Sequence, residues 1–367
     1  MPGIFASLIH RPSANRKGLM MLPAALLLTA CATSTLPPSP SVPGTTATEP
    51  RQAGAPVSTA EQQALQELVT QQDRLYRVAA PLLVKNTELC KNNARNLLGF
   101  TAKNKYSYSA DFINAAEKSL GLNDRLQVMG VLPGSGAARA GIRRGDILAA
   151  VEGKDLPDGE NAERQAAAIL APLMSGRTSV TMTVIRNGAN VSVEVPLTFA
   201  CAFGIELGNT DNVTAYADGH RVLITRGMMN FARSDEELAY VMAKEMAHNA
   251  LAHPARQRMS ATIGGIIDNL TRMHPDMSTM VGMAGVKPMP QTLDAMADKL
   301  SLYMLARAGY SIDNAPSFWK RLASQYPASA LNGYVALHPA TDYRVAAMEK
   351  TIKEIKAKKA SKRPLLP

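Results

Sequence analysis

Apolar side chains recur at helical spacing between residues 60 and 90, and this pattern predicts the first folded segment of the chain. Residues three, four and seven positions apart share one face of a helix. The apolar residues that follow this spacing are Leu65, Leu68, Val69, Leu75 and Val78. Residues 32–59, by contrast, are rich in Pro, Ser and Thr and hold few large apolar side chains. Such a segment cannot bury a core and is expected to be a disordered tether.

The pattern changes in residues 91–200, where short apolar runs alternate with turn residues and predict a β-rich domain. Gln127–Val131 is expected to be a strand, and Gly141 ends a short helix that follows it. A tight turn at Gly145 then leads into another strand. Two later strands flank Asn187-Gly188, a dipeptide strongly favoured in two-residue hairpin turns.

Residues 201–350 carry mainly helical patterns after one short strand. Ser234, three residues before Glu237, begins a capping box at the start of a long helix. That helix is predicted to run as far as His253, and a second long helix is ended by Gly309. The roughly 275 residues after the first helix are too many for one small core, so two domains are expected.

These patterns divide the chain into six segments of different character. The segments are a processing segment (1–31), a tether (32–59), a helix (60–90), a β-rich domain (91–200), a mainly helical domain (201–350) and a basic tail (351–367).

The first 31 residues have the pattern of a bacterial export signal. A cationic start is followed by an apolar stretch from Gly18 to Ala30, which is too short to remain as a membrane-spanning helix. The stretch ends in Leu28-Thr29-Ala30-Cys31, which resembles a lipobox, so Cys31 is predicted to be lipidated. An ordinary signal peptide with a chance cysteine is the alternative. By resemblance to sorted lipoproteins, residues 32 and 33 indicate an outer-membrane anchor that faces the periplasm.

The formal net charge of the chain is +10, and much of the excess lies near its end. The basic residues concerned are Lys350, Lys353, Lys356, Lys358, Lys359, Lys362 and Arg363. A solvated helix face is the favoured interpretation of this run, and attraction to anionic lipid or to the cell wall is the alternative. Nucleic acid is not expected as a partner in the envelope.

Cys90 and Cys201 stand just before and just after the β-rich domain. The two ends of a domain commonly lie close together, and the envelope is oxidising. A disulfide between them is therefore predicted, with two separate buried thiols as the alternative.

The long helix contains Lys244-Glu245-Met246-Ala247-His248, which differs at one residue from the zinc-peptidase motif H-E-x-x-H. Positions i and i+4 share a helix face, so two imidazoles in that motif can bind one zinc ion. The glutamate takes a proton from the metal-bound water. On the second helix, Asp294 and Asp298 repeat the same spacing. His253 is rotated by about 140° from His248 on a regular helix and is predicted to be a packed residue.

Residues 91–200 resemble the PDZ domains of bacterial envelope proteases. The resemblance is carried by the run from Gly134 to Asp146, with the pattern Gly-Ser-x-Ala-x-x-Ala-Gly-Ile-x-x-Gly-Asp. Such domains bind a chain terminus as an added strand and capture its carboxylate with backbone N–H groups. The matching loop is Leu97, Leu98, Gly99 and Phe100. A PDZ fold that serves only as a spacer remains the alternative.

Residues 201–350 resemble the gluzincin peptidases of the HtpX and CAAX-prenyl-protease type. The features that match are Ile224-Thr225-Arg226-Gly227-Met228, Glu237-Leu238-Ala239, the motif helix, Ala308-Gly309-Tyr310, His338-Pro339 and Arg344. The resemblance implies an α+β chain, with a PDZ-like β-barrel or sandwich domain followed by a mostly helical zincin-type domain. It also implies zinc as cofactor and polypeptides as substrates or clients, recognised through an exposed C-terminus.

By resemblance, the metal ligands fall at Lys244, His248 and Asp294. Glu245 and His338 then hold the catalytic positions, and Asp298 and Arg344 support the ligands. Two ligand positions depart from the family, since it has His in place of Lys244 and Glu in place of Asp294.

The lysine is the more severe departure, because a charged ammonium has three donors and no lone pair for a metal. Lys244 is predicted to supply the positive charge of the metal and to pair with Glu245 or Asp294. The competing hypothesis is a residual zinc site of His248, Asp294 and His338, completed by water.

Two functions follow from these hypotheses. One is an envelope zinc endopeptidase for protein quality control or processing, with hydrolysis weakened or lost. The other is an inactive scaffold or adaptor that binds clients through its PDZ-like domain.

Overall fold

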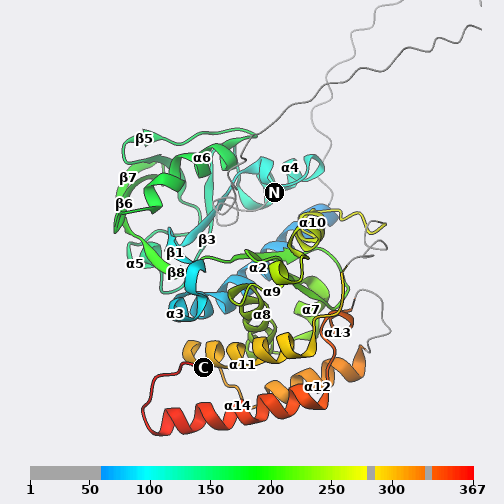
Figure 1. The fold of residues 1–367 in the computed structure, drawn as a ribbon. Coiled ribbons are helices and arrows are strands. Elements are labelled where there is room, and N and C mark those ends of the chain that lie inside the picture. The colour runs from blue at the N-terminus through cyan, green and yellow to red at the C-terminus, as the bar shows by residue number, and fades with distance from the viewer. Residues whose placement is uncertain (1–58, 279–285, 327–332) are drawn as a thin grey trace, which may run out of the picture. The chain divides into compact units, whose positions relative to one another are not determined.

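A computed structural model describes residues 59–278, 286–326 and 333–367 (Figure 1). The predicted signal segment, Cys31 and the tether up to residue 58 lie outside the described residues. Within the described ranges, no helix is both long enough and apolar enough to cross a bilayer.

The predicted first helix is present as α2 (Thr59–Lys85), which is followed by the short α3 (Thr87–Cys90). All five of its predicted apolar positions are buried. The helix contacts α4 of the β-rich domain as well as α8 and α11 of the helical domain. Its end is held by Asn86, whose amide donates hydrogen bonds to the carbonyls of Leu82 and Met304. The helix is therefore a shared element on which both domains pack.

The β-rich domain is built around a mainly antiparallel sheet with the strand order β2-β3-β4-β6-β7, in which β5 pairs with β4. Its apolar core joins the sheet to α6 through residues such as Phe100, Ala166 and Val184. Asn187 and Gly188 both have positive φ, as the predicted hairpin turn requires. The elements are β1 (Ala94–Leu97), β2 (Phe100–Lys103), α4 (Ile113–Leu120), β3 (Gln127–Val131), α5 (Gly136–Arg139), β4 (Ile147–Val151), β5 (Lys154–Asp155), α6 (Ala162–Leu170), β6 (Ser179–Arg186), β7 (Ala189–Pro196) and β8 (Thr198–Cys201).

The two ends of this domain are joined to each other. Strands β1 and β8 form a separate antiparallel pair, in which Ala94 lies opposite Cys201. Cys90 and Cys201 form a disulfide with their Cα atoms 5.7 Å apart. The N–H of Ala202 also donates to the carbonyl of Asn93 at 2.7 Å. The chain thus leaves and re-enters the rest of the molecule at one point.

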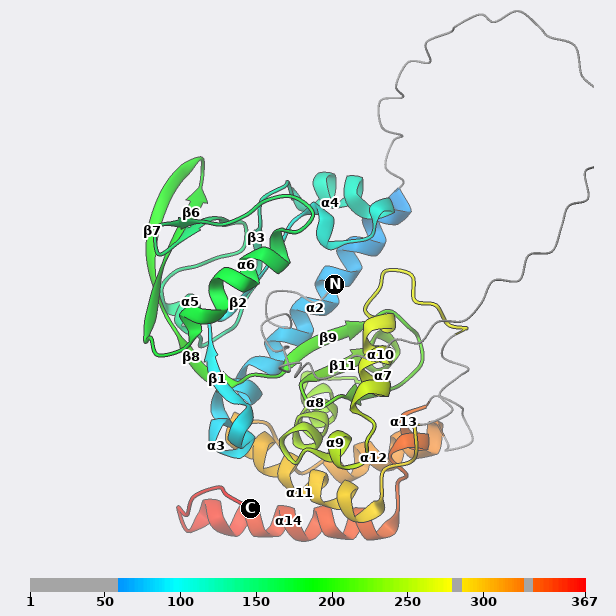
Figure 2. The same ribbon diagram turned by 45° about the horizontal axis from the view of Figure 1, so that its top comes forward.

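The helical domain begins with a three-stranded sheet in the order β10-β11-β9, where β11 is parallel to β9 and antiparallel to β10. Helices α8 and α11 pack side by side (Figure 2), and α14 packs on α11 and α12. The elements are β9 (Gly204–Gly208), β10 (Ala215–Ala217), β11 (Arg221–Thr225), α7 (Arg226–Phe231), α8 (Asp235–Ala250), α9 (His253–Arg256), α10 (Ser260–Leu270), α11 (Gln291–Ala308), α12 (Ala315–Gln325), α13 (Tyr334–Leu337) and α14 (Asp342–Ala360).

The motif helix α8 ends earlier than the sequence predicts. It stops at Ala250, and Ala252 adopts a left-handed conformation with φ 55° before α9 begins at His253. The prediction of one regular helix as far as His253 was therefore wrong. Because the chain turns at this point, the helical rotation that seemed to separate His253 from His248 does not apply.

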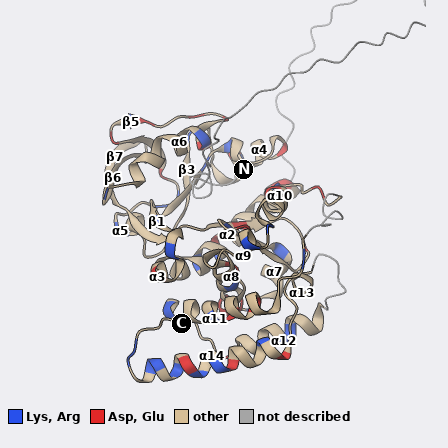
Figure 3. Cartoon of the chain, in the orientation of Figure 1, with Lys and Arg blue, Asp and Glu red and all other residues tan. Residues whose placement is uncertain are grey.

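The basic end of the chain is largely helical. α14 runs through the segment predicted as a basic tail as far as Ala360, and it buries Ile352 and Ile355. Basic and acidic residues alternate with other residues along it (Figure 3). Lys356 pairs with Asp313 at 2.8 Å, and Lys358 pairs with Glu354 at 2.8 Å. The helix therefore continues past residue 350, where the basic tail was predicted to begin, because one of its sides buries apolar residues.

Candidate functional site

Helix α8 presents Lys244, Glu245 and His248 to the interior of the helical domain. Its N-cap Ser234 accepts a hydrogen bond from the backbone N–H of Glu237, as the capping box predicts. From Leu238 to Asn249 every residue of this helix is buried. The three polar side chains of the motif must therefore find their partners inside the protein.

Lys244 finds its partners on α11. Its Nζ lies 3.3 Å from Oδ1 of Asp294 and 3.1 Å from Oδ1 of Asp298. The side chains of Lys244 and Asp294 are 0% exposed, and that of Asp298 is 1% exposed. These contacts are ion pairs rather than aligned hydrogen bonds, because Nζ has no partner with hydrogen-bond geometry. The prediction of an Asp294 partner agrees with this geometry, but the second partner is Asp298 and not Glu245.

Aromatic rings complete the surroundings of the ammonium. Nζ of Lys244 lies 5.0 Å from the ring centroid of Trp319 and 5.8 Å from that of Tyr334. The two rings stack on each other at 5.5 Å with an interplanar angle of 18°. A desolvated ammonium over aromatic faces is attracted by their quadrupoles. Two carboxylates and two ring faces thus surround one buried cation.

A second cation, Arg344 of α14, balances the second aspartate. Its Nε and one terminal nitrogen donate to the two oxygens of Asp298 at 2.7 and 3.0 Å. Another terminal nitrogen donates to the carbonyls of His338 and Pro339. Arg344 therefore fixes both Asp298 and the loop that carries His338.

Three histidines lie next to these charges. Nδ1 of His338 is 2.8 Å from Oδ1 of Asp294, and Nε2 of His248 is 3.2 Å from the same oxygen. The second contact lacks hydrogen-bond geometry, so Nε2 of His248 has no hydrogen-bond partner although the residue is 1% exposed. Nδ1 of His253 lies 3.0 Å from Nδ1 of His248. The structure thus brings His253, which the sequence analysis set aside, into contact with the site.

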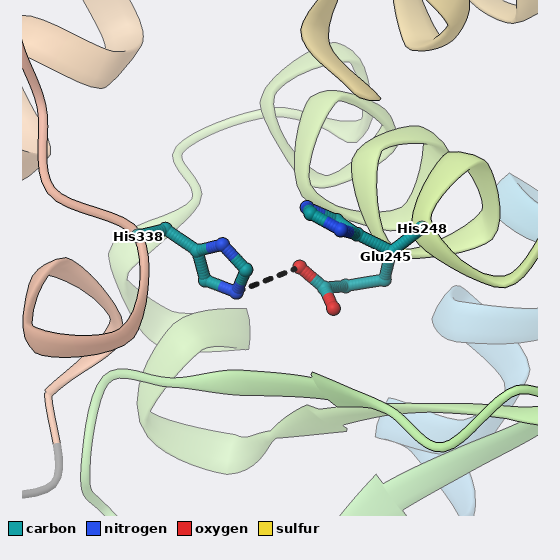
Figure 4. Close-up of side chains that lie close together, drawn as sticks. All are labelled: Glu245, His248 and His338. Atoms are coloured by element: carbon teal, nitrogen blue, oxygen red, sulfur yellow. Dashed lines mark ion pairs between the residues drawn. The ribbon is translucent and has the colours of Figure 1, made fainter. Parts of the chain in front are cut away.

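Glu245 lies beside His248 and His338 (Figure 4). Oε1 of its carboxylate accepts a 2.7 Å hydrogen bond from the hydroxyl of Tyr334 and lies 3.8 Å from Nε2 of His338. A cavity of about 20 Å³ adjoins Glu245, His248 and His338, and apolar residues such as Met289 and Leu337 line the rest of it. This volume holds about one water molecule.

The charges of the site balance without a metal. Burial raises the pKa of Asp294, but the charge of Lys244 and the contact with His338 outweigh burial, so that this pKa lies well below its ordinary value. The pKa of Asp298 is also below its ordinary value. Burial raises this pKa, but the positive charges of Lys244 and Arg344 lower it by more. Burial raises the pKa of Glu245. Two cations therefore face two ionised aspartates, while Glu245 has no dedicated counter-ion.

Burial also sets the state of the imidazoles. It lowers the pKa of both His248 and His338 below the ordinary histidine value. It lowers the pKa of His253 to about 3, with the neighbouring His248 as the next cause. Neutral imidazoles are the form that offers a lone pair to a metal or a proton.

The fold and this residue set define a class, namely a PDZ-like domain joined to a helical domain whose two central helices are arranged as in zinc metallopeptidases, with Lys244 in place of the first ligand. The family follows from comparison: residues 184–352 match peptidase family M48, and residues 127–186 match the PDZ domain. The matched regions are therefore a PDZ domain followed by a region of similarity to the M48 metallopeptidases.

Two relatives and one solved structure illustrate the similarity. The chain is 27% identical over 161 residues to the beta-barrel assembly-enhancing protease of Escherichia coli K12. The aligned region covers 39% of this chain and 33% of that protein. The chain is 28% identical over 130 residues to the mitochondrial metalloendopeptidase OMA1 of Arabidopsis thaliana. Here the aligned region covers 32% of this chain and 25% of that protein. The chain thus spans a third or less of the length of these relatives. The HtrA-type protease AlgW with a decapeptide is 25% identical, with 29% of this chain and 30% of that chain covered and a TM-score of 0.22.

The residues at the family's zinc position do not fit zinc. Family resemblance places the first ligand at Lys244, whose ammonium has no lone pair and is held by two carboxylates. Asp294, the expected third ligand, is already engaged by Lys244 and His338. A zinc ion at this position would have to displace the lysine from both ion pairs.

The predicted peptide loop is tightly packed in the PDZ domain. Gly99 has φ 88°, and a Cβ on it would lie 2.4 Å from Cβ of Ser135. Leu98 and Phe100 belong to the domain's core. Strand β2, which follows the loop, is at an edge of the sheet. A bulky substitution at Gly99 would therefore disturb folding and would not report on peptide binding.

Proposed function

We propose that this protein is an envelope lipoprotein that binds polypeptide clients for quality control and has lost zinc-dependent hydrolysis. The observation that carries the proposal is the position of Lys244, whose ammonium is fully buried between Asp294 and Asp298. A monovalent cation there supplies positive charge to the acidic pair but does not activate water.

Client binding is assigned to the PDZ domain. PDZ domains add a peptide as a strand to an exposed sheet edge, and β2, one of the two end strands of this sheet, is preceded by Leu97, Leu98 and Gly99. The relatives named as proteases suggest that the clients are polypeptides. Lipidation at Cys31 and an outer-membrane location facing the periplasm complete the proposal, because they would place this domain among envelope proteins.

The direct test is a proteolysis assay on the purified chain with excess zinc and an unfolded, fluorescently labelled polypeptide. We expect the chain and its Glu245→Gln variant to show the same background, because Lys244 occupies the family's first zinc-ligand position, so no zinc-activated water reaches Glu245 as general base. Zinc-dependent cleavage by the unaltered chain that Glu245→Gln abolishes would contradict the loss of hydrolysis.

The double variant Lys244→His with Asp294→Glu is expected to gain zinc affinity at the family position. It restores an imidazole lone pair and a longer carboxylate at the two positions that depart from the family. Isothermal titration with zinc measures the gain, and Lys320→His on the exposed face of α12 is the matched control. An unchanged affinity in the double variant would mean that these residues no longer meet at the family's zinc position.

Peptides with a free carboxylate are expected to bind the chain at least about tenfold more tightly than the same peptides with an amidated end. The expectation follows from carboxylate capture by backbone N–H groups in the loop before β2. Fluorescence anisotropy with matched peptide pairs measures the ratio. Equal binding of both forms would reject the assigned loop and favour a spacer role for the PDZ domain.

A further inference from the structure

Three ligand-bearing side chains meet beside Lys244 in a set different from the family's. Glu245, His248 and His338 are all buried, and one ligand atom from each lies within 4.8 Å of the others. Two imidazole nitrogens and one carboxylate oxygen are a donor set that proteins use for divalent transition metals. We propose that these residues form a displaced site for a divalent transition-metal ion.

The orientation of the imidazoles supports this site. Nδ1 of His338 faces Oδ1 of Asp294 at 2.8 Å, so its proton is held there and Nε2 is left with its lone pair. That Nε2 is 3.8 Å from Oε1 of Glu245. Two ligand atoms of one tetrahedral metal are about 3.4 Å apart when each bond is about 2.1 Å. A movement of a few tenths of an ångström therefore brings both atoms to one ion.

His248 is arranged in the same way. Its Nδ1 contacts Nδ1 of His253 at 3.0 Å, while its buried Nε2 lies 3.2 Å from Oδ1 of Asp294 without hydrogen-bond geometry. A histidine that ligates a metal almost always donates its other N–H to a neighbouring acceptor. His253 and Asp294 stand at these acceptor positions for His248 and His338. His253 is thus a positioning residue. Its burial beside His248 is explained if it holds that imidazole in the orientation needed for a metal.

The cavity supplies the remaining position. Its volume of about 20 Å³ beside Glu245, His248 and His338 accommodates one water molecule. Three protein ligands and one water complete the coordination of a divalent ion. The ion's charge would be only partly neutralised, because Glu245 is the single carboxylate among the ligands and Lys244 remains paired with Asp294 and Asp298. We therefore expect an affinity below that of an intact M48 site.

Metal binding here would not restore hydrolysis. At the family's zinc position Glu245 is free to accept a proton from water, whereas in the displaced site its carboxylate is consumed as a ligand. Metal binding and proteolysis are therefore separable in this protein. The proposal goes beyond the proposed function, and failure to bind metal would leave the loss of hydrolysis intact.

Titration of the purified chain with cobalt(II) tests the site by a readout that is independent of activity. We expect a visible ligand-field band with one equivalent bound and displacement of the cobalt by zinc. Glu245→Gln and His338→Ala are each expected to weaken cobalt affinity more than about 100-fold, and His253→Phe about 10- to 100-fold. The controls are Glu349→Gln and His274→Ala, which alter exposed residues and should leave the affinity unchanged.

The Glu245→Gln result is decisive, because this variant keeps the side-chain shape and the acceptor for Tyr334. A metal at the family position would not need Glu245 as a ligand, so full affinity in this variant would overturn the displaced site. Absence of a cobalt band in the folded, unaltered chain at excess metal would also overturn it. Circular dichroism of each variant shows that a lost band does not reflect unfolding.

Discussion

Replacement of Lys244 by alanine is expected to lower the free energy of unfolding of the helical domain by about 3–5 kcal/mol. The substitution leaves Asp294 and Asp298 buried, with Arg344 as the only remaining charged partner among the described residues, and an uncompensated buried charge is costly. Denaturant unfolding followed by the fluorescence of Trp319, the single tryptophan of the chain, measures the loss. Its ring lies next to the altered site.

Lys244→Met separates charge from packing, because methionine keeps much of the lysine's volume but has no charge. We expect this variant to be nearly as unstable as Lys244→Ala. Lys320→Ala on α12 is the exposed control and should cost little, since Lys320 is in contact with solvent. A loss below about 1 kcal/mol in both Lys244 variants would show that the ammonium does not hold the two helices together.

Loss of the disulfide is expected to have an effect of similar size. Cys90 and Cys201 are 111 residues apart in sequence, and the chain-entropy estimate for closing a loop of about 100 residues is roughly 4.7 kcal/mol, with about 2–5 kcal/mol typical of native bridges. The double variant Cys90→Ala with Cys201→Ala should therefore unfold at a clearly lower temperature. Calorimetry under oxidising conditions measures the shift.

The reducing agent dithiothreitol provides the matched comparison for this prediction. It should lower the unfolding temperature of the unaltered chain to that of the double variant and leave the variant unchanged. Equal unfolding temperatures of the two proteins before reduction would contradict a stabilising bridge.

Much of the fold could be predicted because it depends on local signals. The strand Gln127–Val131, the turn at Asn187-Gly188 and the cap at Ser234 each follow from a few neighbouring residues, and the structure has all three. The end of α8 could not be predicted in this way. Ala252 adopts positive φ although nothing in its side chain favours it, so the local sequence carries no signal for this turn.

The site was predictable only as far as helix spacing reaches. Positions i and i+4 placed Lys244 with His248 and Asp294 with Asp298 on common faces, and the structure brings these two faces together. Trp319 and Tyr334 were missed because they come from α12 and α13, and no spacing in the sequence relates them to α8. Lys244 pairs with Asp298 and not with Glu245 because of the way α8 and α11 cross. The spacing of residues along the sequence does not contain this crossing geometry.

The shared helix α2 gives the architecture a further meaning. α2 precedes the PDZ domain in sequence but packs on α8 and α11 of the peptidase domain, and the chain passes from Asn93 into the PDZ domain and back to Ala202 through a single hydrogen-bonded, disulfide-linked neck. The PDZ domain therefore lies in the sequence between α2 and the helices α8 and α11 on which α2 packs. Because α2 also packs on α4 of this domain, any exchange of the module at its neck would have to preserve that face of the shared helix.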